Sequence, residues 1–129
     1  MNASTPVPPP LHELEEAVME EIWAHEETCV RQVMEAVNAR TATGRAYTTY
    51  MTIMARLDAK GLLIRRREGK TDLYRAVYTR ERYADLRAGA EIESTVAQFG
   101  EVALAHLARQ IAQLDPAHRR SLQRLARRK

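Results

Sequence analysis

The chain has 129 residues, 45% of them apolar, which fits one compact domain or a small domain with an appendage. A single cysteine, Cys29, excludes an internal disulfide framework, and neither cysteines nor histidines are spaced to bind a metal, so we expect no metal and no cofactor. No apolar run approaches the ~20 residues of a membrane span and residues 1–10 lack the features of a signal peptide, so we expect a cytoplasmic protein without membrane insertion.

The net charge of +3 conceals a polarised distribution. Residues 1–39 carry a net charge of −7, residues 40–79 carry +6 and residues 80–129 carry +4. A strongly basic central block beside an acidic first segment indicates one polarised face, and chance clustering on a solvated surface explains the composition equally well.

The first elements are an arm and two helices. Residues 1–10 are rich in proline and are predicted to be a disordered arm. A helix is predicted over residues 11–24, with Leu14, Val18 and Ile22 on its apolar stripe. Its exposed side is predicted to be a solvated glutamate face: Glu13, Glu15, Glu16, Glu20 and Glu21. A second helix follows Thr28, its predicted N-cap, and fades within residues 38–44.

The third helix is predicted over residues 45–60, and Gly61 is placed as its C-cap glycine. Its buried stripe is Tyr50, Ile53, Met54 and Leu57. The opposite face carries small side chains, hydroxyls and arginines: Arg45, Thr48, Thr52, Ala55, Arg56 and Ala59, with Thr49 at the edge. Such side chains let a helix approach a DNA groove and bond phosphates or base edges. An ordinary solvated face would favour Glu and Lys.

Strand-like periodicity follows in residues 62–67 and 72–77, with turn chemistry between them at residues 68–71. Four basic residues cluster toward the tip of this hairpin: Arg65, Arg66, Arg67 and Lys70. Their positive charges are suited to DNA phosphates. Phosphate contacts position a protein on the duplex without reading its base sequence. Taken alone, they would also suit an edge strand protected from aggregation.

Residues 79–129 are predicted to be helical, with Thr79 as N-cap, weak points at Gly89 and Gly100, and a restart at Asp115-Pro116. Apolar residues recur at intervals of three and four, and the predicted dimerisation residues are Tyr83, Leu86, Ile92, Val96, Phe99, Leu107 and Ile111. So long a stripe must be buried, on the first domain or against a second copy. A second copy is favoured because DNA readers of this size commonly dimerise.

Three helices followed by a hairpin are the layout of a winged helix-turn-helix, whose third helix enters the major groove while the hairpin touches the flanking backbone. The predicted fold is mainly α with a small antiparallel β-hairpin. It comprises a winged helix-turn-helix DNA-binding domain in residues 11–78 and a helical dimerisation arm in residues 79–129.

Several segments also resemble the BlaI/MecI/CopY family of penicillinase repressors. They are residues 14–23 (LEEAVMEEIW), 30–33 (VRQV), 46–57 (AYTTYMTIMARL) and 60–62 (KGL). The resemblance covers residues 11–78 and extends to the C-terminal third only in length and helical character. One position departs from the family, because Tyr50 stands where a smaller β-branched residue is usual.

The resemblance implies a homodimeric transcriptional repressor of antibiotic-resistance operons, or in some branches of copper homeostasis. Its recognition helix maps onto residues 47–60, which adds Tyr47 to the predicted DNA contacts. In the β-lactam branch, the resemblance implies cleavage by a membrane-bound zinc-metallopeptidase sensor at an Asn-Phe bond. Gln98-Phe99 falls at the similar place and is the candidate cleavage site, although Gln98 departs from the pattern and Phe99 is interpreted first as a dimer-core aromatic. The paired cysteines of the copper branch are absent from the C-terminal segment.

The sequence therefore predicts a repressor, and not an enzyme, that binds a two-fold symmetric double-stranded DNA operator as a homodimer. Two alternatives stay open: a protein-interaction adaptor that uses the winged helix as a docking surface, and a transcriptional activator. An enzyme would need a pocket with convergent titratable groups, and the sequence shows no such set.

Overall fold

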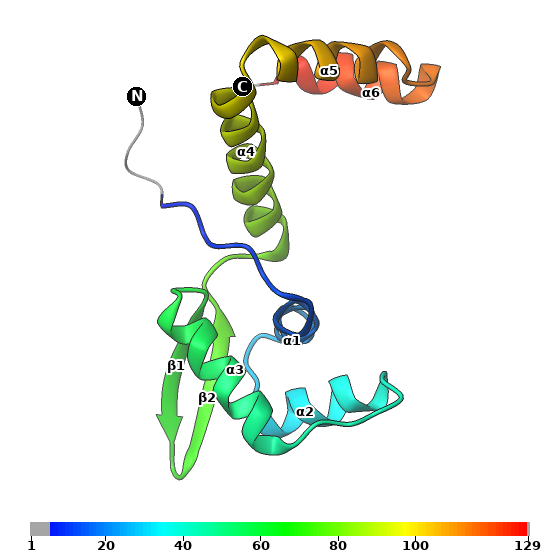
Figure 1. Cartoon of the computed structure of the whole chain (residues 1–129). Coiled ribbons are helices and arrows are strands. Elements are labelled where there is room, and N and C mark those ends of the chain that lie inside the picture. The colour runs from blue at the N-terminus through cyan, green and yellow to red at the C-terminus, as the bar shows by residue number, and fades with distance from the viewer. Residues whose placement is uncertain (1–5, 129) are drawn as a thin grey trace. The chain divides into compact units, whose positions relative to one another are not determined.

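A computed structural model describes residues 6–128 of the chain. Its elements follow one another as α1 (Glu13–Trp23), α2 (Val30–Ala39), α3 (Tyr47–Ala59), β1 (Leu63–Glu68), β2 (Thr71–Ala76), α4 (Arg80–Phe99), α5 (Glu101–Ala112) and α6 (Pro116–Ala126) (Figure 1). The predicted fold class is thereby confirmed: mainly α, with one antiparallel hairpin between the third and fourth helices.

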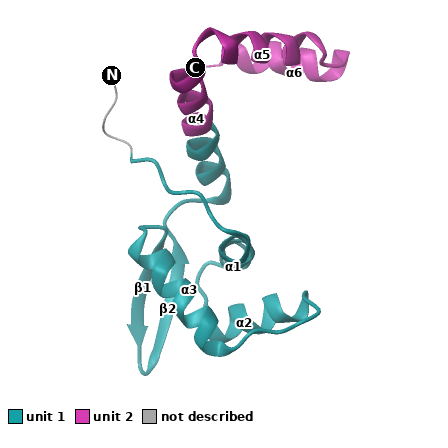
Figure 2. Cartoon of the chain, in the orientation of Figure 1, with its two compact units in different colours: residues 1–88 teal, residues 89–129 magenta. Residues whose placement is uncertain are grey.

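The chain divides into two compact units that meet at the Ala88–Gly89 bond, inside α4 (Figure 2). The sequence instead suggested a boundary before this helix, between residues 78 and 79. The structure differs because the first turns of α4 pack on the first unit. The ring of Tyr83 lies 5.4 Å from that of Trp23, centroid to centroid, and Tyr83 packs against the buried core of that unit.

The core of the first unit is shared by α1, α2, α3 and the hairpin. Its buried side chains come from all five elements and the segment between α3 and β1: Val18, Met19, Ile22, Val30, Val33, Val37, Tyr50, Ile53, Met54, Leu57, Leu62, Leu63 and Tyr74. The predicted buried stripe of α3 is confirmed in full. The opposite side of α3 is therefore left on the surface of the unit.

The helix α3 ends as predicted, because Gly61 has a φ of 83°, a left-handed conformation that glycine adopts without strain. The N–H of Leu62 then donates to the carbonyl of Leu57 at 3.0 Å. Because α3 ends abruptly here, β1 begins only a few residues later, and the hairpin packs against α3.

The hairpin pairs Leu63 with Ala76 at its base and Glu68 with Thr71 at its tip. A further antiparallel bridge joins Tyr74 to Thr28, whose backbones exchange hydrogen bonds of 2.7 and 2.9 Å. Thr28 is therefore not the N-cap that the sequence suggested. Cys29 takes that position, because the backbone of Thr28 pairs with β2.

The prediction of a disordered arm over residues 1–10 concerns two different regions. Residues 1–5 lie outside the described residues. Pro8 and Pro9 form extended chain whose carbonyls accept hydrogen bonds from Arg87 (3.3 Å) and from the hydroxyl of Tyr83 (2.8 Å). Pro8 is buried. Disorder is therefore wrong for this part of the arm, because α4 supplies donors that no local sequence pattern reveals.

The second unit holds the rest of α4, together with α5 and α6. The helix α4 runs without a break through Gly89, whereas Gly100 has a φ of 59° and separates α4 from α5. Only the second of the two predicted weak points therefore interrupts the helix. The restart at Asp115-Pro116 is confirmed, since the carboxylate of Asp115 accepts the N–H of His118 at 2.8 Å.

Candidate nucleic-acid interface

The surface of α3 opposite its buried stripe carries the predicted groove-facing residues. Arg45, in the preceding turn, and Tyr47, Thr48, Thr52 and Arg56 are exposed. Thr49 is half-buried at the edge of this face. Thr48, Thr49, Thr52, Ile53 and Arg56 line one shallow depression. The structure therefore brings the predicted recognition residues onto one continuous helical surface, with hydroxyls beside a guanidinium.

The electrostatics of this face favour an anionic ligand. Neither Arg45 nor Arg56 forms an ion pair with any residue in the range 6–128. A guanidinium without a carboxylate partner is available for a phosphate or for a guanine edge, and it need not first leave an internal ion pair.

One residue of this surface was not predicted as a DNA contact. The guanidinium of Arg31, at the start of α2, lies over the ring of Tyr47, 5.7 Å from its centroid. A cation over an aromatic face is attracted by the ring quadrupole. Arg31 therefore holds Tyr47 at the rim of the α3 surface and adds a positive charge there. Its place in a helix-turn-helix, at the start of the helix before α3, was the signal that could have identified it.

The three arginines of β1, Arg65, Arg66 and Arg67, divide between the two faces of the hairpin, because successive residues of a strand point to opposite faces and directly paired residues share a face. Arg65 pairs with the buried Tyr74 and Arg67 pairs with Asp72, so both lie on the core-facing side. Arg65 lies 3.8 Å from the carboxylate of Asp58 on α3, and Arg67 lies 3.3 Å from that of Asp72. These side chains are half or more exposed, and their long contacts leave them able to turn toward a ligand.

Arg66 lies on the other face and is held more firmly. Its Nε and Nη2 donate to the two carboxylate oxygens of Glu27 at 2.6 and 2.8 Å. This bidentate contact lowers the pKa of the Glu27 carboxyl below its ordinary value. Arg66 thus joins the wing to the segment between α1 and α2. Lys70, at the hairpin tip, forms no ion pair within the described part of the chain.

The glutamates of α1 are not the uniformly solvated face that the sequence suggested. Glu15 is only 2% exposed, because its carboxylate folds back on the N–H of His12 (3.0 Å) and also accepts the ammonium of Lys60 (2.9 Å). Burial raises the pKa of Glu15, and the His12 and Lys60 contacts outweigh burial and hold the pKa below its ordinary 4.5. Lys60 is the C-cap residue of α3, so this pair fixes the C-terminal end of that helix.

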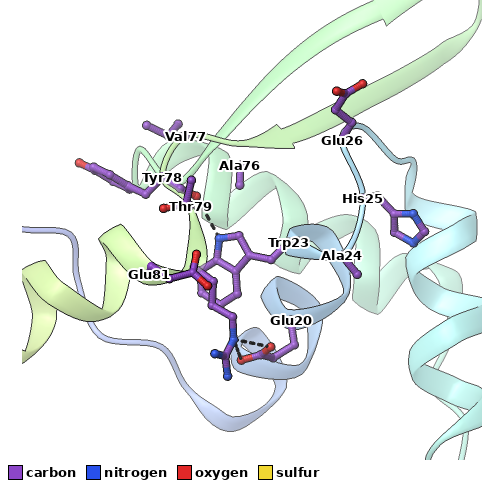
Figure 3. Close-up of a pocket in the computed structure, with 11 residues that line it drawn as sticks. Glu20, Trp23, Ala24, His25, Glu26, Ala76, Val77, Tyr78, Thr79 and Glu81 are labelled. Carbon is purple, nitrogen blue, oxygen red and sulfur yellow. Dashed lines mark hydrogen bonds and ion pairs between the residues drawn. The ribbon is translucent and has the colours of Figure 1, made fainter.

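An open pocket of about 520 Å³ lies on the first unit where the end of α1 meets the chain from β2 into α4 (Figure 3). Polar groups of the residues that line this pocket are bonded to one another. The indole N–H of Trp23 donates to the carbonyl of Tyr78 at 3.1 Å, and the carboxylate of Glu20 binds Arg80 at 2.9 Å. These bonds join the start of α4 to α1. Over residues 6–128, no group of His, Cys, Asp and Glu side chains is placed to hold a metal ion.

The predicted dimerisation residues are distributed over both units. Tyr83 packs in the first unit, and Leu86 and Val96 are half-buried. Large apolar side chains stay exposed on the second unit: Ile92, Phe99, Val102, Leu104, Leu107, Ile111 and Leu125. Two largely apolar grooves of about 380 and 160 Å³ open there, and Leu107 lines both. None of the helices in residues 6–128 is long and apolar enough to cross a membrane.

Comparison with known families gives a match over nearly the whole chain. The family model described as Penicillinase repressor matches residues 11–128. A protein described as Transcriptional regulator BlaI, from Mycobacterium tuberculosis, is 36% identical over 118 residues, which cover 89% of this chain and 84% of that protein. The sequences from two strains of that organism match equally.

Two solved structures resemble the fold. The DNA-binding domain of the repressor BlaI, determined in solution, superimposes with a TM-score of 0.51 and 24% identity, covering 61% of this chain and 93% of that domain. The structure of hsRosR-S1 in a complex gives a TM-score of 0.50 at 12% identity, covering 79% of this chain and 89% of that one. The first of these supports the winged-helix architecture predicted from the order of elements.

Proposed function

This chain belongs to the penicillinase repressor family, and we propose that it is a transcriptional repressor that occupies a two-fold symmetric DNA operator as a homodimer. The observation that carries the proposal is the exposed face of α3, where three threonines and two arginines without acidic partners gather on one surface. A helix that reads the major groove needs such a face, because hydroxyls and guanidiniums bond base edges and phosphates.

In this proposal α3 is the recognition helix. Thr48, Thr52 and Arg56 contact base edges, while Arg45, Tyr47 and Thr49 contact the sugar-phosphate backbone or the rim of the groove. Small hydroxyl side chains keep the helix axis close to the groove floor, and the guanidinium of Arg56 matches the two acceptors of guanine.

The hairpin acts as the wing. Arg65, Arg67 and Lys70 contact phosphates beside the half-site, which supplies affinity without sequence preference. Nε and Nη2 of Arg66 are bonded to Glu27, so Arg66 can offer these two donors to a phosphate only when it leaves that carboxylate. The wing therefore offers fewer free charges than its arginine count suggests.

Dimerisation is assigned to the second unit. Phe99 and Val102 are 55% and 62% exposed, and both line the larger apolar groove. Exposed apolar surface of this extent marks an interaction site on a soluble chain. A second copy is the proposed occupant, since two winged helices held together read two half-sites spaced about one helical turn (~34 Å) or a multiple apart.

Release from DNA is proposed to follow loss of the dimer. Gln98 and Phe99 lie at the exposed C-terminal end of α4, immediately before the left-handed Gly100. A cut there by a membrane-bound metallopeptidase sensor would separate α5 and α6 from the DNA-binding unit. The site of action is the cytoplasm, where the operator is. The family is one of transcriptional regulators, and the proposal assigns the chain no catalytic step.

The test is capture of genomic DNA fragments by the purified full chain over a series of salt concentrations. We expect a two-fold symmetric motif upstream of a few genes, with an affinity that falls steeply as salt rises. The matched control is Arg56→Ala, which should lose the motif and keep the weak binding to all fragments. Weak binding without any motif, in both proteins, would favour an adaptor that docks a protein partner.

A further inference from the structure

The start of the recognition helix lacks the usual fixing device. Ala46 occupies the N-cap of α3 and makes no side-chain cap, whereas Ser, Thr, Asp or Asn at this position would bond the first free N–H groups. The preceding residues, 40–46, are exposed and belong to no helix or strand. Because residues at the N-terminal end of a recognition helix are the ones that reach base edges, something else must hold this end in place.

The side chain of Asn38, in the last turn of α2, instead bonds the backbone of Arg45, the residue before the N-cap Ala46. Its Oδ1 accepts the N–H of Arg45 at 3.0 Å, and its Nδ2 donates to the carbonyl of Arg45 at 3.0 Å. The amide therefore pairs with both backbone groups of one residue, as a neighbouring strand would. Reversing the amide would place its NH₂ against an N–H donor, so the observed orientation is the one that satisfies all groups.

A second side chain completes the arrangement from the helix itself. The hydroxyl of Tyr50 donates to the same Oδ1 at 2.6 Å, and Tyr50 is 1% exposed. Burial raises the pKa of this phenol, so its hydroxyl stays protonated and remains a donor. The turn also packs closely on the amide, since a Cβ added to Gly44 would lie 3.3 Å from Cγ and Nδ2 of Asn38. The Asn38 side chain thus links the end of the turn, at Arg45, to α2 and, through Tyr50, to the core of α3.

We propose that Asn38 and Tyr50 are positioning residues that set the sequence specificity of the recognition helix. Together they hold the backbone of Arg45 and the first turn of α3 at a fixed distance from the buried core. The inference rests on the proposed function, because it assigns these residues a role in how α3 meets DNA. Neither residue contacts DNA in this account, and each acts through the placement of the exposed residues that follow.

The experiment compares Asn38→Ala and Tyr50→Phe with wild type, using the full chain. The control is Tyr78→Phe, since the hydroxyl of Tyr78 has no hydrogen-bond partner in residues 6–128. The two probes are a duplex selected by the wild-type protein from a randomised library and the same duplex with its sequence scrambled. The measured quantity is the ratio of the two dissociation constants, together with the melting temperature of each protein.

We expect the ratio to fall about tenfold for Asn38→Ala and about threefold for Tyr50→Phe, in line with the worth of the hydrogen bonds that each removes. Affinity for the scrambled duplex and its salt dependence should not change, and Tyr78→Phe should match wild type. Tyr50→Phe keeps the buried ring, so it remains informative if Asn38→Ala lowers the melting temperature. Amide hydrogen exchange at Arg45, whose N–H donates to Oδ1 of Asn38, should accelerate in both variants in the free protein.

Three results would overturn the inference. A wild-type protein that prefers its selected duplex, with variants that share the full preference, would refute the positioning role and leave the proposed function intact. Equal weakening on both duplexes would show that these residues only stabilise the unit. A wild-type protein without any preference would refute the proposed function as well, and unchanged exchange at Arg45 would then show independently that the turn is not held by Asn38.

Discussion

The ammonium nitrogen of Lys60 lies 2.9 Å from Oε2 of Glu15, so the C-terminal end of α3 is bonded to the first turn of α1. Glu15 is buried and Lys60 keeps about a quarter of its side-chain surface in solvent. The carboxylate also accepts the N–H of His12. The buried carboxylate of Glu15 therefore accepts a backbone N–H at the start of α1 and holds the C-terminal end of α3.

Replacing Glu15 by Gln should destabilise the first unit. The amide keeps an acceptor for His12 and loses the charge that pairs with Lys60. Because Lys60 can turn to solvent, we expect a loss of about 1–2 kcal/mol, below the cost of breaking a fully buried pair. Urea denaturation of the truncated chain that ends at Ala90 measures the loss. Glu13→Gln, an exposed neighbour in the same turn, is the control, and an equal effect of both substitutions would show that the ion pair contributes nothing.

The stability of the chain should fall with acid below about pH 4.5. The folded state lowers the pKa of Glu15 from 4.5, through His12 and Lys60 acting against burial, and it lowers that of Glu21 from 4.5, chiefly through Arg40. A lowered folded pKa means that the folded state binds fewer protons, so stability is full above the unfolded pKa and is lost as pH falls through the folded one. Thermal melting from pH 7 to pH 3 checks the sign. The double variant Glu15→Gln, Glu21→Gln should show a flatter profile, and a profile as steep as that of wild type would contradict the assignment.

Releasing Arg66 should strengthen binding to all DNA. Glu27→Gln removes the carboxylate to which Nε and Nη2 of Arg66 donate. The guanidinium then keeps only its longer, 3.7 Å contact with the exposed Glu68 and becomes available to a phosphate, so the slope of log affinity against log salt should steepen by about one unit. Arg67→Ala and Lys70→Ala should each flatten the slope by about one unit. Titration of a scrambled duplex by fluorescence anisotropy measures all three, and no change with Glu27→Gln would mean that Arg66 faces away from the backbone.

Thr52 should affect base preference where the wing arginines do not. Thr52→Ser keeps the hydroxyl and removes a methyl group of the kind that recognises thymine, whereas Thr52→Ala removes the hydroxyl and keeps a methyl-sized side chain. Selection from a randomised duplex library should give motifs that differ at one position, with about 1–3 kcal/mol of altered discrimination there. If Thr52 and Arg67 variants change affinity in the same sequence-independent way, the division between recognition helix and wing is wrong.

A charge at Leu107 should produce a monomer. Leu107 lines both apolar grooves of the second unit, so Leu107→Glu places a carboxylate where a second copy would bury apolar surface. Sedimentation analysis should show the loss of the dimer, with helicity by circular dichroism retained. Ser94→Glu, an exposed site on the side of α4 away from Ile92 and Val96, is the control. The chain truncated after Ala90 should be folded and monomeric, and a dimer of unchanged stability would refute the assignment of the arm.

Local patterns in the sequence were sufficient for most of the fold. The stripe of α3, the stop at Gly61 and the restart at Asp115 depend on residues within one or two turns of each other, so periodicity and cap chemistry identify them. The exposed threonine face follows from the same periodicity, because fixing the buried stripe fixes the opposite side as well.

The features that escaped prediction depend on segments that meet only after folding. Glu15 is separated from Lys60, and Glu27 from Arg66, by many residues of sequence. A glutamate in an acidic helix has the same local pattern whether it ends in water or against a lysine. The bonds from Asn38 to Arg45 span a turn whose shape no repeat encodes. Contacts of this kind are determined by the tertiary fold and leave no local pattern in the sequence.

Gly89 and Gly100 face opposite constraints on their evolution, although both lie in the helical arm. Nothing lies within 4 Å of a Cβ added at Gly89, and that residue is inside α4, so drift to alanine there would be tolerated and would favour the helix by about 1 kcal/mol. Gly100 has a φ of 59° and a ψ of −130°, a combination that L-residues avoid. A lineage can therefore replace the first glycine freely, whereas replacing the second would require it to rebuild the corner between α4 and α5.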